Sequence, residues 1–191
     1  LAWCYGFNHE EAERCFRRAI DADPTCAMAH WGVAYAAGPN YNMPWKNFTG
    51  SELPDMVALC HTAAQNALSH VKGTTPLESL LIHALVQRFP SSEAESAEAC
   101  APWDEAYATA MRAIYQAYPE SPDVCALTAD ALMLRTPWQL WDISTGEPAE
   151  GADSLEARRI LESAMALFED CLGYTSPSPR DLAQSRLPSS A

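Results

Sequence analysis

One helical pattern recurs four times along the chain and constrains its fold more than any other feature. Each copy has a small or β-branched apolar residue on either side of a large one, at spacings of four and three residues, and the first three copies end in a proline. The copies are Ala12, Phe16, Ala19 and Pro24; Ala64, Leu68, Val71 and Pro76; Ala110, Ile114, Ala117 and Pro122; and Ala157, Leu161 and Ala164. Residues at these spacings share one stripe of an α-helix, where small side chains let a neighbouring helix approach closely. Apolar residues recur at this helical period and do not alternate, so we predict an all-α fold.

Two local signals predict where helices begin. Pro76 suits the first position of a helix, because the N–H that proline lacks has no partner there. Thr75 before it and Glu78 after it predict a capping box, in which each side chain accepts the other residue's backbone N–H. Asn8 is predicted to cap an earlier helix in the same way, with Glu11 reaching back.

The pattern Ala-x3-Phe-x2-Ala-x4-Pro at residues 12–24 resembles the second half of a tetratricopeptide repeat. This resemblance covers about residues 1–170 and implies a right-handed superhelix of stacked helical hairpins, a solenoid. The family period is about 34 residues, whereas successive copies here begin 52, 46 and 47 residues apart. The additional residues are expected between the two helices of each unit, as long loops at 38–54, 90–103 and 136–153. The expected units span about 1–25, 26–75, 76–122 and 123–171.

Both ends of the sequence suggest a piece of a longer array. The chain begins with Leu1 and not with Met, and residues 1–5 read as the middle of a helix. Residues 172–191 are rich in Ser and Pro, have no helical periodicity and resemble translated sequencing-adapter read-through. We therefore expect residues 172–191 to be a disordered, artefactual tail.

Charge and composition restrict the class of partner. The 191 residues carry 12 Lys and Arg against 25 Asp and Glu, a formal charge of −13. Such acidity argues against nucleic acid as the partner, because phosphate binding depends on clustered Lys and Arg, and it favours a basic protein or peptide. No apolar run approaches the roughly 18 to 20 residues of a membrane span. The seven cysteines are odd in number and lack any CxxC pair, which indicates reduced packing residues and favours a cytoplasmic location.

Few residues of the sequence are candidates for a metal site or for catalysis. Cys26 and His30 lie four residues apart and Cys60 precedes His61, but no HExxH or CxxC motif completes a zinc site. His9 begins a charged segment that we interpret as a first helical turn facing water. No GxSxG or phosphate loop is present, so we predict no cofactor, no metal and no enzymatic activity. The alternative is a helical regulatory or metal-binding segment of a larger enzyme whose catalytic part lies outside this sequence.

The resemblance also suggests a ligand groove. Tetratricopeptide repeats line their concave surface mainly with the first helix of each unit, which here offers Trp31, Tyr35, His83 and Gln87. Asn40, Tyr41 and Asn42 stand at the mouth of the first loop, placed to hydrogen-bond an extended peptide. The resemblance therefore implies a non-catalytic scaffold that binds a protein or peptide in its groove.

Tryptophans in the expected loops allow two interpretations. Trp45, Trp138 and Trp141 lie in the inserted segments, and Trp103 lies at the end of one. Either these indoles fold back onto the helices and anchor the long loops, or they join the groove and bind the ligand, since tryptophan is common in binding hot spots.

Overall fold

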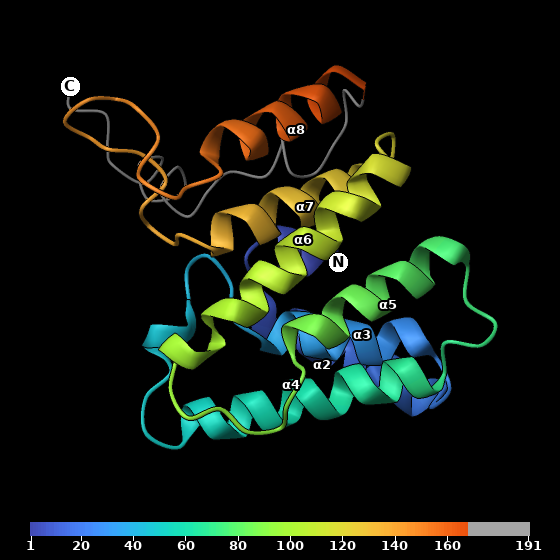
Figure 1. Ribbon diagram of the computed structural model, residues 1–191. Coiled ribbons are helices and arrows are strands. Elements are labelled where there is room, and N and C mark those ends of the chain that lie inside the picture. Colours follow the sequence, from blue (N-terminus) through green and yellow to red (C-terminus); the bar gives the residue numbers. More distant parts are fainter. Residues whose placement is uncertain (168–191) are drawn as a thin grey trace, which may run out of the picture.

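The computed structural model describes residues 1–167, and within them the protein is all-α, as predicted (Figure 1). Cys171 and the predicted tail at 172–191 lie outside the described residues. In the described part no β-strand forms, and two isolated bridges join Asn40 to Met43 and Trp141 to Pro148. The helices are α1 (Ala2–Tyr5), α2 (His9–Ala22), α3 (Ala27–Ala37), α4 (Glu52–Ser69), α5 (Pro76–Arg88), α6 (Ala101–Ala117), α7 (Pro122–Leu134) and α8 (Ser154–Leu167), with short 3-10 turns η1 (Trp45–Asn47) and η2 (Glu98–Cys100).

The predicted helix starts are confirmed, with one correction. The Asn8 side chain accepts the backbone N–H of Glu11 at 3.2 Å and caps α2. Thr75 and Glu78 form the full capping box of α5, with the Thr75 backbone N–H 2.8 Å from the Glu78 carboxylate. Glu11 does not reach back to Asn8, because its carboxylate pairs with Arg14 at 2.9 Å on the surface of α2.

The helices pack in chain order. Each one from α1 to α8 contacts the next, and α3 also packs against α5. In Figure 1 the succession runs from α2, α3 and α4 at the bottom to α8 at the top. The long connections fall between α3 and α4, between α5 and α6, and between α7 and α8, where the extended loops are expected.

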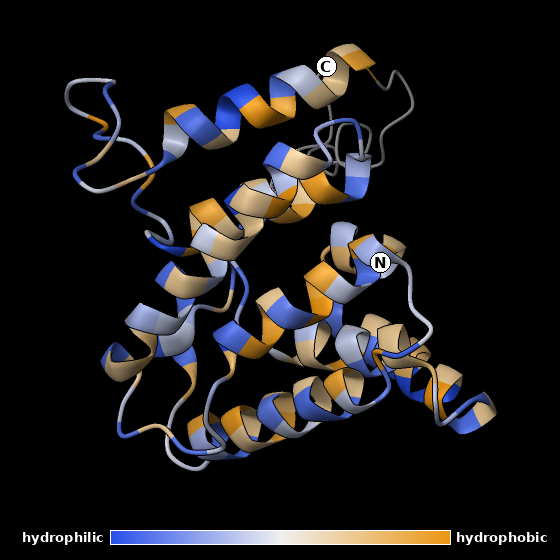
Figure 2. Cartoon of the chain, turned by 45° about the vertical axis from the view of Figure 1, so that its right-hand side comes forward, coloured by the Kyte–Doolittle hydropathy of each residue, from blue (hydrophilic) through white to orange (hydrophobic). Residues whose placement is uncertain are grey.

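The recurring pattern faces the core only in part. Its leading alanine is buried in α2, α4 and α8, at Ala12, Ala64 and Ala157, and is half-buried in α6. The closing alanines Ala19 and Ala117 are exposed. Polar and apolar segments accordingly alternate along the long helices in Figure 2.

Close approach between α2 and α3 depends on a glycine. A Cβ added at Gly32 would lie 2.2 Å from Cδ1 of the Phe16 ring, the large residue of the first copy of the pattern. The Phe16 ring is half-buried at this contact. Gly32 therefore provides the space into which Phe16 packs.

We expect Gly32→Ala to destabilise the fold by about 1–3 kcal/mol, the usual cost of overpacking a core. Urea unfolding followed by circular dichroism measures the change. Gly6→Ala is the matched control, because a Cβ there would meet its nearest atom at 3.4 Å. Equal stability of Gly32→Ala and the unmodified chain would contradict the assigned contact.

A buried ion pair joins α5, α6 and the loop between α3 and α4. Arg88 is fully buried, and its Nε lies 3.3 Å from Oδ1 of Asp104. The other carboxylate oxygen, Oδ2, accepts the indole N–H of Trp45 at 2.6 Å, and Arg88 Nη2 donates to the Pro39 carbonyl at 2.8 Å. The loop is therefore held at two points by groups that are themselves buried.

Asp104→Asn should destabilise the protein by about 3–5 kcal/mol, because it leaves the Arg88 charge buried without a counterion. The free energy of unfolding in urea measures this loss. Glu13→Gln is the control: it breaks a surface ion pair with Arg17 at 2.6 Å and should change stability by about 1 kcal/mol or less. Similar losses in the two variants would show that the buried pair is not needed for stability.

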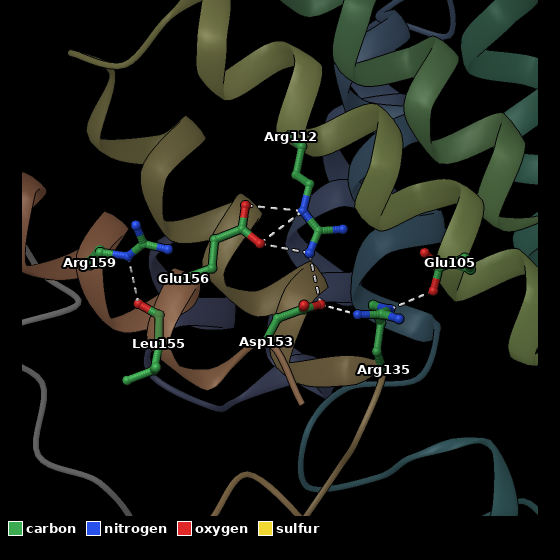
Figure 3. Close-up of polar contacts among 7 residues, drawn as sticks. All are labelled: Glu105, Arg112, Arg135, Asp153, Leu155, Glu156 and Arg159. Carbon is green, nitrogen blue, oxygen red and sulfur yellow. Dashed lines mark hydrogen bonds and ion pairs between the residues drawn. The ribbon is translucent and has the colours of Figure 1, made fainter. Parts of the chain in front are cut away.

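A second set of ion pairs attaches the start of α8 to α6 and α7 (Figure 3). Asp153, immediately before α8, pairs with Arg112 of α6 at 2.9 Å and with Arg135 at the end of α7. Arg112 also holds Glu156 in the first turn of α8 at 2.7 Å, and Arg135 holds Glu105 of α6 at 2.6 Å. These partly exposed contacts fix where α8 begins and hence where its side chains point.

Candidate functional site

A cavity of about 280 Å³ lies among side chains of α1, α2, α3, α7 and α8 and the turn that follows α3. Segments far apart in the sequence meet at its wall, since the Tyr5 hydroxyl of α1 donates to the Asp123 carboxylate of α7 at 2.7 Å. The lining residues are Cys4, Tyr5, Phe7, His9, Tyr35, Asn40, Tyr41, Asn42, Ala126, Ala129, Asp130, Met133 and Leu161.

The Asp130 carboxylate is the one acidic group of this lining. Its Oδ2 accepts a hydrogen bond from the Tyr35 hydroxyl at 3.1 Å, which joins α7 to α3. Burial raises the pKa of Asp130, and Arg88 and the Tyr35 hydrogen bond act in the opposite direction. Burial also raises the pKa of Tyr35, so its phenol keeps its proton and remains a donor to Asp130.

Cys4 and His9 line the same cavity without forming a reactive pair. Burial raises the pKa of Cys4 to about 11, which keeps the thiol protonated at neutral pH. Burial, with a smaller effect from Arg88, lowers the pKa of His9, so its imidazole is neutral. The Nδ1 atom of His9 is buried and takes part in no hydrogen bond within the described residues. A nucleophilic cysteine needs a lowered pKa and a base within hydrogen-bond reach, and this arrangement supplies neither.

A tight turn at residues 40–43 forms one rim of the cavity. The backbones of Asn40 and Met43 exchange two hydrogen bonds of 3.1 and 3.0 Å. The Asn40 side-chain oxygen accepts the backbone N–H groups of Asn42 and Met43 at 3.0 and 3.1 Å. Asn40 thus shapes the turn, while Tyr41 and Asn42 at its tip remain partly or fully exposed.

The cavity brings together four of the seven residues predicted for a groove: Tyr35, Asn40, Tyr41 and Asn42. Trp31 is not among them. It is 1% exposed, stacks on Tyr35 with ring centroids 5.0 Å apart, and donates its indole N–H to the Leu81 carbonyl at 3.1 Å. The expected groove is corrected accordingly, because Trp31 joins α3 to α5 inside the core. His83 and Gln87 are exposed on α5 and do not line the cavity.

The loop tryptophans differ from one another. Trp45 is buried against Phe89 and Trp103, with ring centroids 6.1 and 5.8 Å away. Trp138 and Trp141 are 49% and 41% exposed in the connection before α8, and the Lys46 ammonium lies 4.5 Å from the Trp138 ring centroid. None of these tryptophans lines the cavity.

The histidines considered for a metal site have other contacts. His30 Nε2 lies 2.8 Å from the Pro24 carbonyl, and His61 Nδ1 lies 2.8 Å from the Phe89 carbonyl. Among residues 1–167 no three His, Cys, Asp or Glu side chains gather in a way that would hold a metal ion. Cys26 and Cys60 carry free thiols.

Sequence reasoning missed the other nine residues that line the cavity, namely Cys4, Tyr5, Phe7, His9, Ala126, Ala129, Asp130, Met133 and Leu161. His9 is half-buried and not directed fully to water, as its place in a charged first turn suggested. For Asp130 a signal existed, since it is the one charged residue within the apolar run from Val124 to Leu134.

Comparison with known proteins adds no assignment. The chain matches no family model, no curated protein and no solved structure. Within the described part, no helix combines the length and the apolar character that crossing a membrane requires.

Asp130→Asn should become progressively more stable, relative to the unmodified chain, as the pH rises above about 4. The raised pKa means that the folded state holds the Asp130 proton more tightly than the unfolded state, whose pKa is about 3.9. The contribution of Asp130 to the free energy of unfolding is therefore fully present below the unfolded pKa, and it is lost as the pH rises through the folded pKa. The groups that act on Asp130 are Tyr35 of α3, Arg88 of α5 and Asp104 of α6.

Urea unfolding of both proteins across this pH range measures the difference. Asp55→Asn, an exposed change in the first turn of α4, controls for the altered net charge. A stability difference that does not vary with pH would contradict the assigned burial of the Asp130 charge.

Proposed function

We propose that this chain is a non-catalytic scaffold that binds a protein or peptide, built as a helical-hairpin array of the tetratricopeptide type. The cavity between α1, α3 and α7 is its proposed ligand site. The observation that carries the proposal is the convergence of Tyr35, Asn40, Tyr41 and Asn42 on this one cavity. The repeat resemblance suggests Tyr35 as a groove residue, and the position of Asn40, Tyr41 and Asn42 at the mouth of the first loop suggests the other three.

The packing order supports the array. Every helix contacts its successor, and α3 contacts α5, as expected when the first helices of neighbouring hairpins stack. The long connections leave this stacking order intact, and the first of them contributes the cavity rim. In this proposal, the half-buried Tyr41 and the exposed Asn42 are available for contact with a ligand, while buried groups such as Trp45 keep the loop in place.

The chemistry of the lining supports binding over catalysis. Tyrosine combines a large apolar surface with a polar hydroxyl and is enriched where proteins bind one another. Three tyrosines line the cavity: Tyr5, Tyr35 and Tyr41. The thiol beside them is held protonated and the imidazole neutral, so the lining offers recognition groups without an activated nucleophile.

Selection of a random displayed-peptide library against the purified chain should yield peptides that bind saturably with one site per chain in isothermal titration calorimetry. Tyr41→Ala should weaken the selected peptides about 10-fold or more, because Tyr41 lies at the exposed tip of the rim. Gln87→Ala is the control, since Gln87 is exposed on α5 away from the cavity. It should leave affinity unchanged.

Two results would contradict this function. Failure of every selected peptide to bind saturably would reject a peptide-binding role. Loss of binding in Gln87→Ala together with full binding in Tyr41→Ala would show that the ligand binds the surface of α5 and not the cavity.

A further inference from the structure

We propose that the cavity binds the ammonium group of a lysine side chain presented by a basic partner, with Asp130 as its counterion and the surrounding aromatic rings as its walls. This inference rests on the proposed function, because it takes the cavity to be the ligand site. It goes further by naming the chemical group that the site recognises.

Asp130 has an acceptor that the protein itself leaves unused. Oδ2 accepts the Tyr35 hydroxyl, and within residues 1–167 Oδ1 has no hydrogen bond and no ion pair, while Arg88 attracts the carboxylate from beyond ion-pair distance. The other interior carboxylate differs, because both oxygens of Asp104 are occupied, by Arg88 and Trp45. The carboxylate that faces the cavity is thus the one without a direct ion pair inside the described part of the protein.

The aromatic lining favours a cation over other ligand groups. Tyr5, Phe7, Tyr35 and Tyr41 line the cavity together with Asp130. The faces of aromatic rings attract ammonium groups, most strongly where water is excluded. An anion would be repelled by Asp130, and a purely apolar group would leave its carboxylate desolvated without a partner. His9 brings no competing positive charge, since its imidazole is neutral.

The geometry favours lysine over arginine. A guanidinium binds carboxylates best through two parallel N–H bonds to both oxygens, whereas an ammonium acts as a compact point charge. Tyr35 already takes one acceptor position of Oδ2, so a guanidinium would compete with the phenol for its second contact, whereas an ammonium can use Oδ1 alone. The cavity volume of about 280 Å³ is many times the roughly 30 Å³ of a water molecule, enough for an alkyl stem and its ammonium.

The proposed lysine is one that a partner presents. The whole sequence contains two lysines, Lys46 and Lys72, and neither lines the cavity. Residues 168–191 contain two arginines and no lysine. The formal charge of −13 makes a lysine-rich partner the complementary one.

Three small probes test this site on the full chain: N-α-acetyl-lysine methylamide, its ε-acetylated form and the corresponding arginine compound. Titration followed by 1H–15N NMR should show saturable shifts of the Tyr41, Asn42 and Asp130 amides with the lysine probe. ε-Acetylation removes the charge and should weaken binding about 10-fold or more. The arginine probe should bind more weakly than lysine, because its second N–H contact competes with the Tyr35 hydroxyl for Oδ2.

Asp130→Asn keeps the size of the side chain and should abolish the preference for lysine over ε-acetyl-lysine. Asp55→Asn, which makes the same charge change on the exposed face of α4, should retain it. The probe series on the unmodified chain decides the question even if Asp130→Asn does not fold. Equal binding of the lysine and ε-acetyl-lysine probes, or tighter binding of arginine, would overturn the proposal. Selected peptides that bind through Tyr41 while the lysine probes show no preference would overturn the lysine site alone and leave the proposed function standing.

Discussion

The burial of Arg88 is the constraint on which the other parts of the molecule depend. An unpaired charge inside a protein costs several kcal/mol, so the groups around this guanidinium must be in place together. They come from two segments: Asp104 lies on α6, and the connection between α3 and α4 supplies the Pro39 carbonyl and Trp45, which donates to the far oxygen of Asp104. Pro39 and Trp45 lie on either side of the turn at residues 40–43. The Arg88–Asp104 ion pair therefore positions the rim of the cavity. It holds the 14-residue connection between α3 and α4 at Pro39 and Trp45, which are both buried.

Features set by neighbouring residues were predictable from the sequence, and features set by remote contacts were not. The caps at Asn8 and Thr75 depend on residues three positions away and were predicted correctly. Trp31 was misplaced because the repeat resemblance assigns the first helix of a unit to an exposed groove. The composition of α3 carried the opposite signal, since Ala27–Ala37 has no charged residue and is apolar nearly all round, as buried helices are.

The candidate site depends on contacts that no local pattern encodes. The Tyr35–Asp130 bond spans 95 residues of sequence and the Tyr5–Asp123 bond spans 118. His9 illustrates the difficulty, because the same residue begins a helix whose exposed face is charged and also lines a cavity closed by α7. The acidic start of α2 could be predicted from the sequence, but the burial of His9 depends on where α1 and α7 meet.

The two interior carboxylates differ in position and contacts: Asp104 pairs with Arg88 and supports the fold, whereas Asp130 lines the candidate site. Asp104 is bonded through both oxygens and neutralises Arg88, so its removal leaves a charge exposed to an apolar interior. Asp130 is bonded through one oxygen only, although burial raises the pKa of both carboxyls. Because Asp130 is half-buried and oriented by Tyr35 before any ligand arrives, a cation entering the cavity would meet a prearranged counterion. The same burial that makes Asp130 unfavourable for folding would thus strengthen its attraction for an ammonium group.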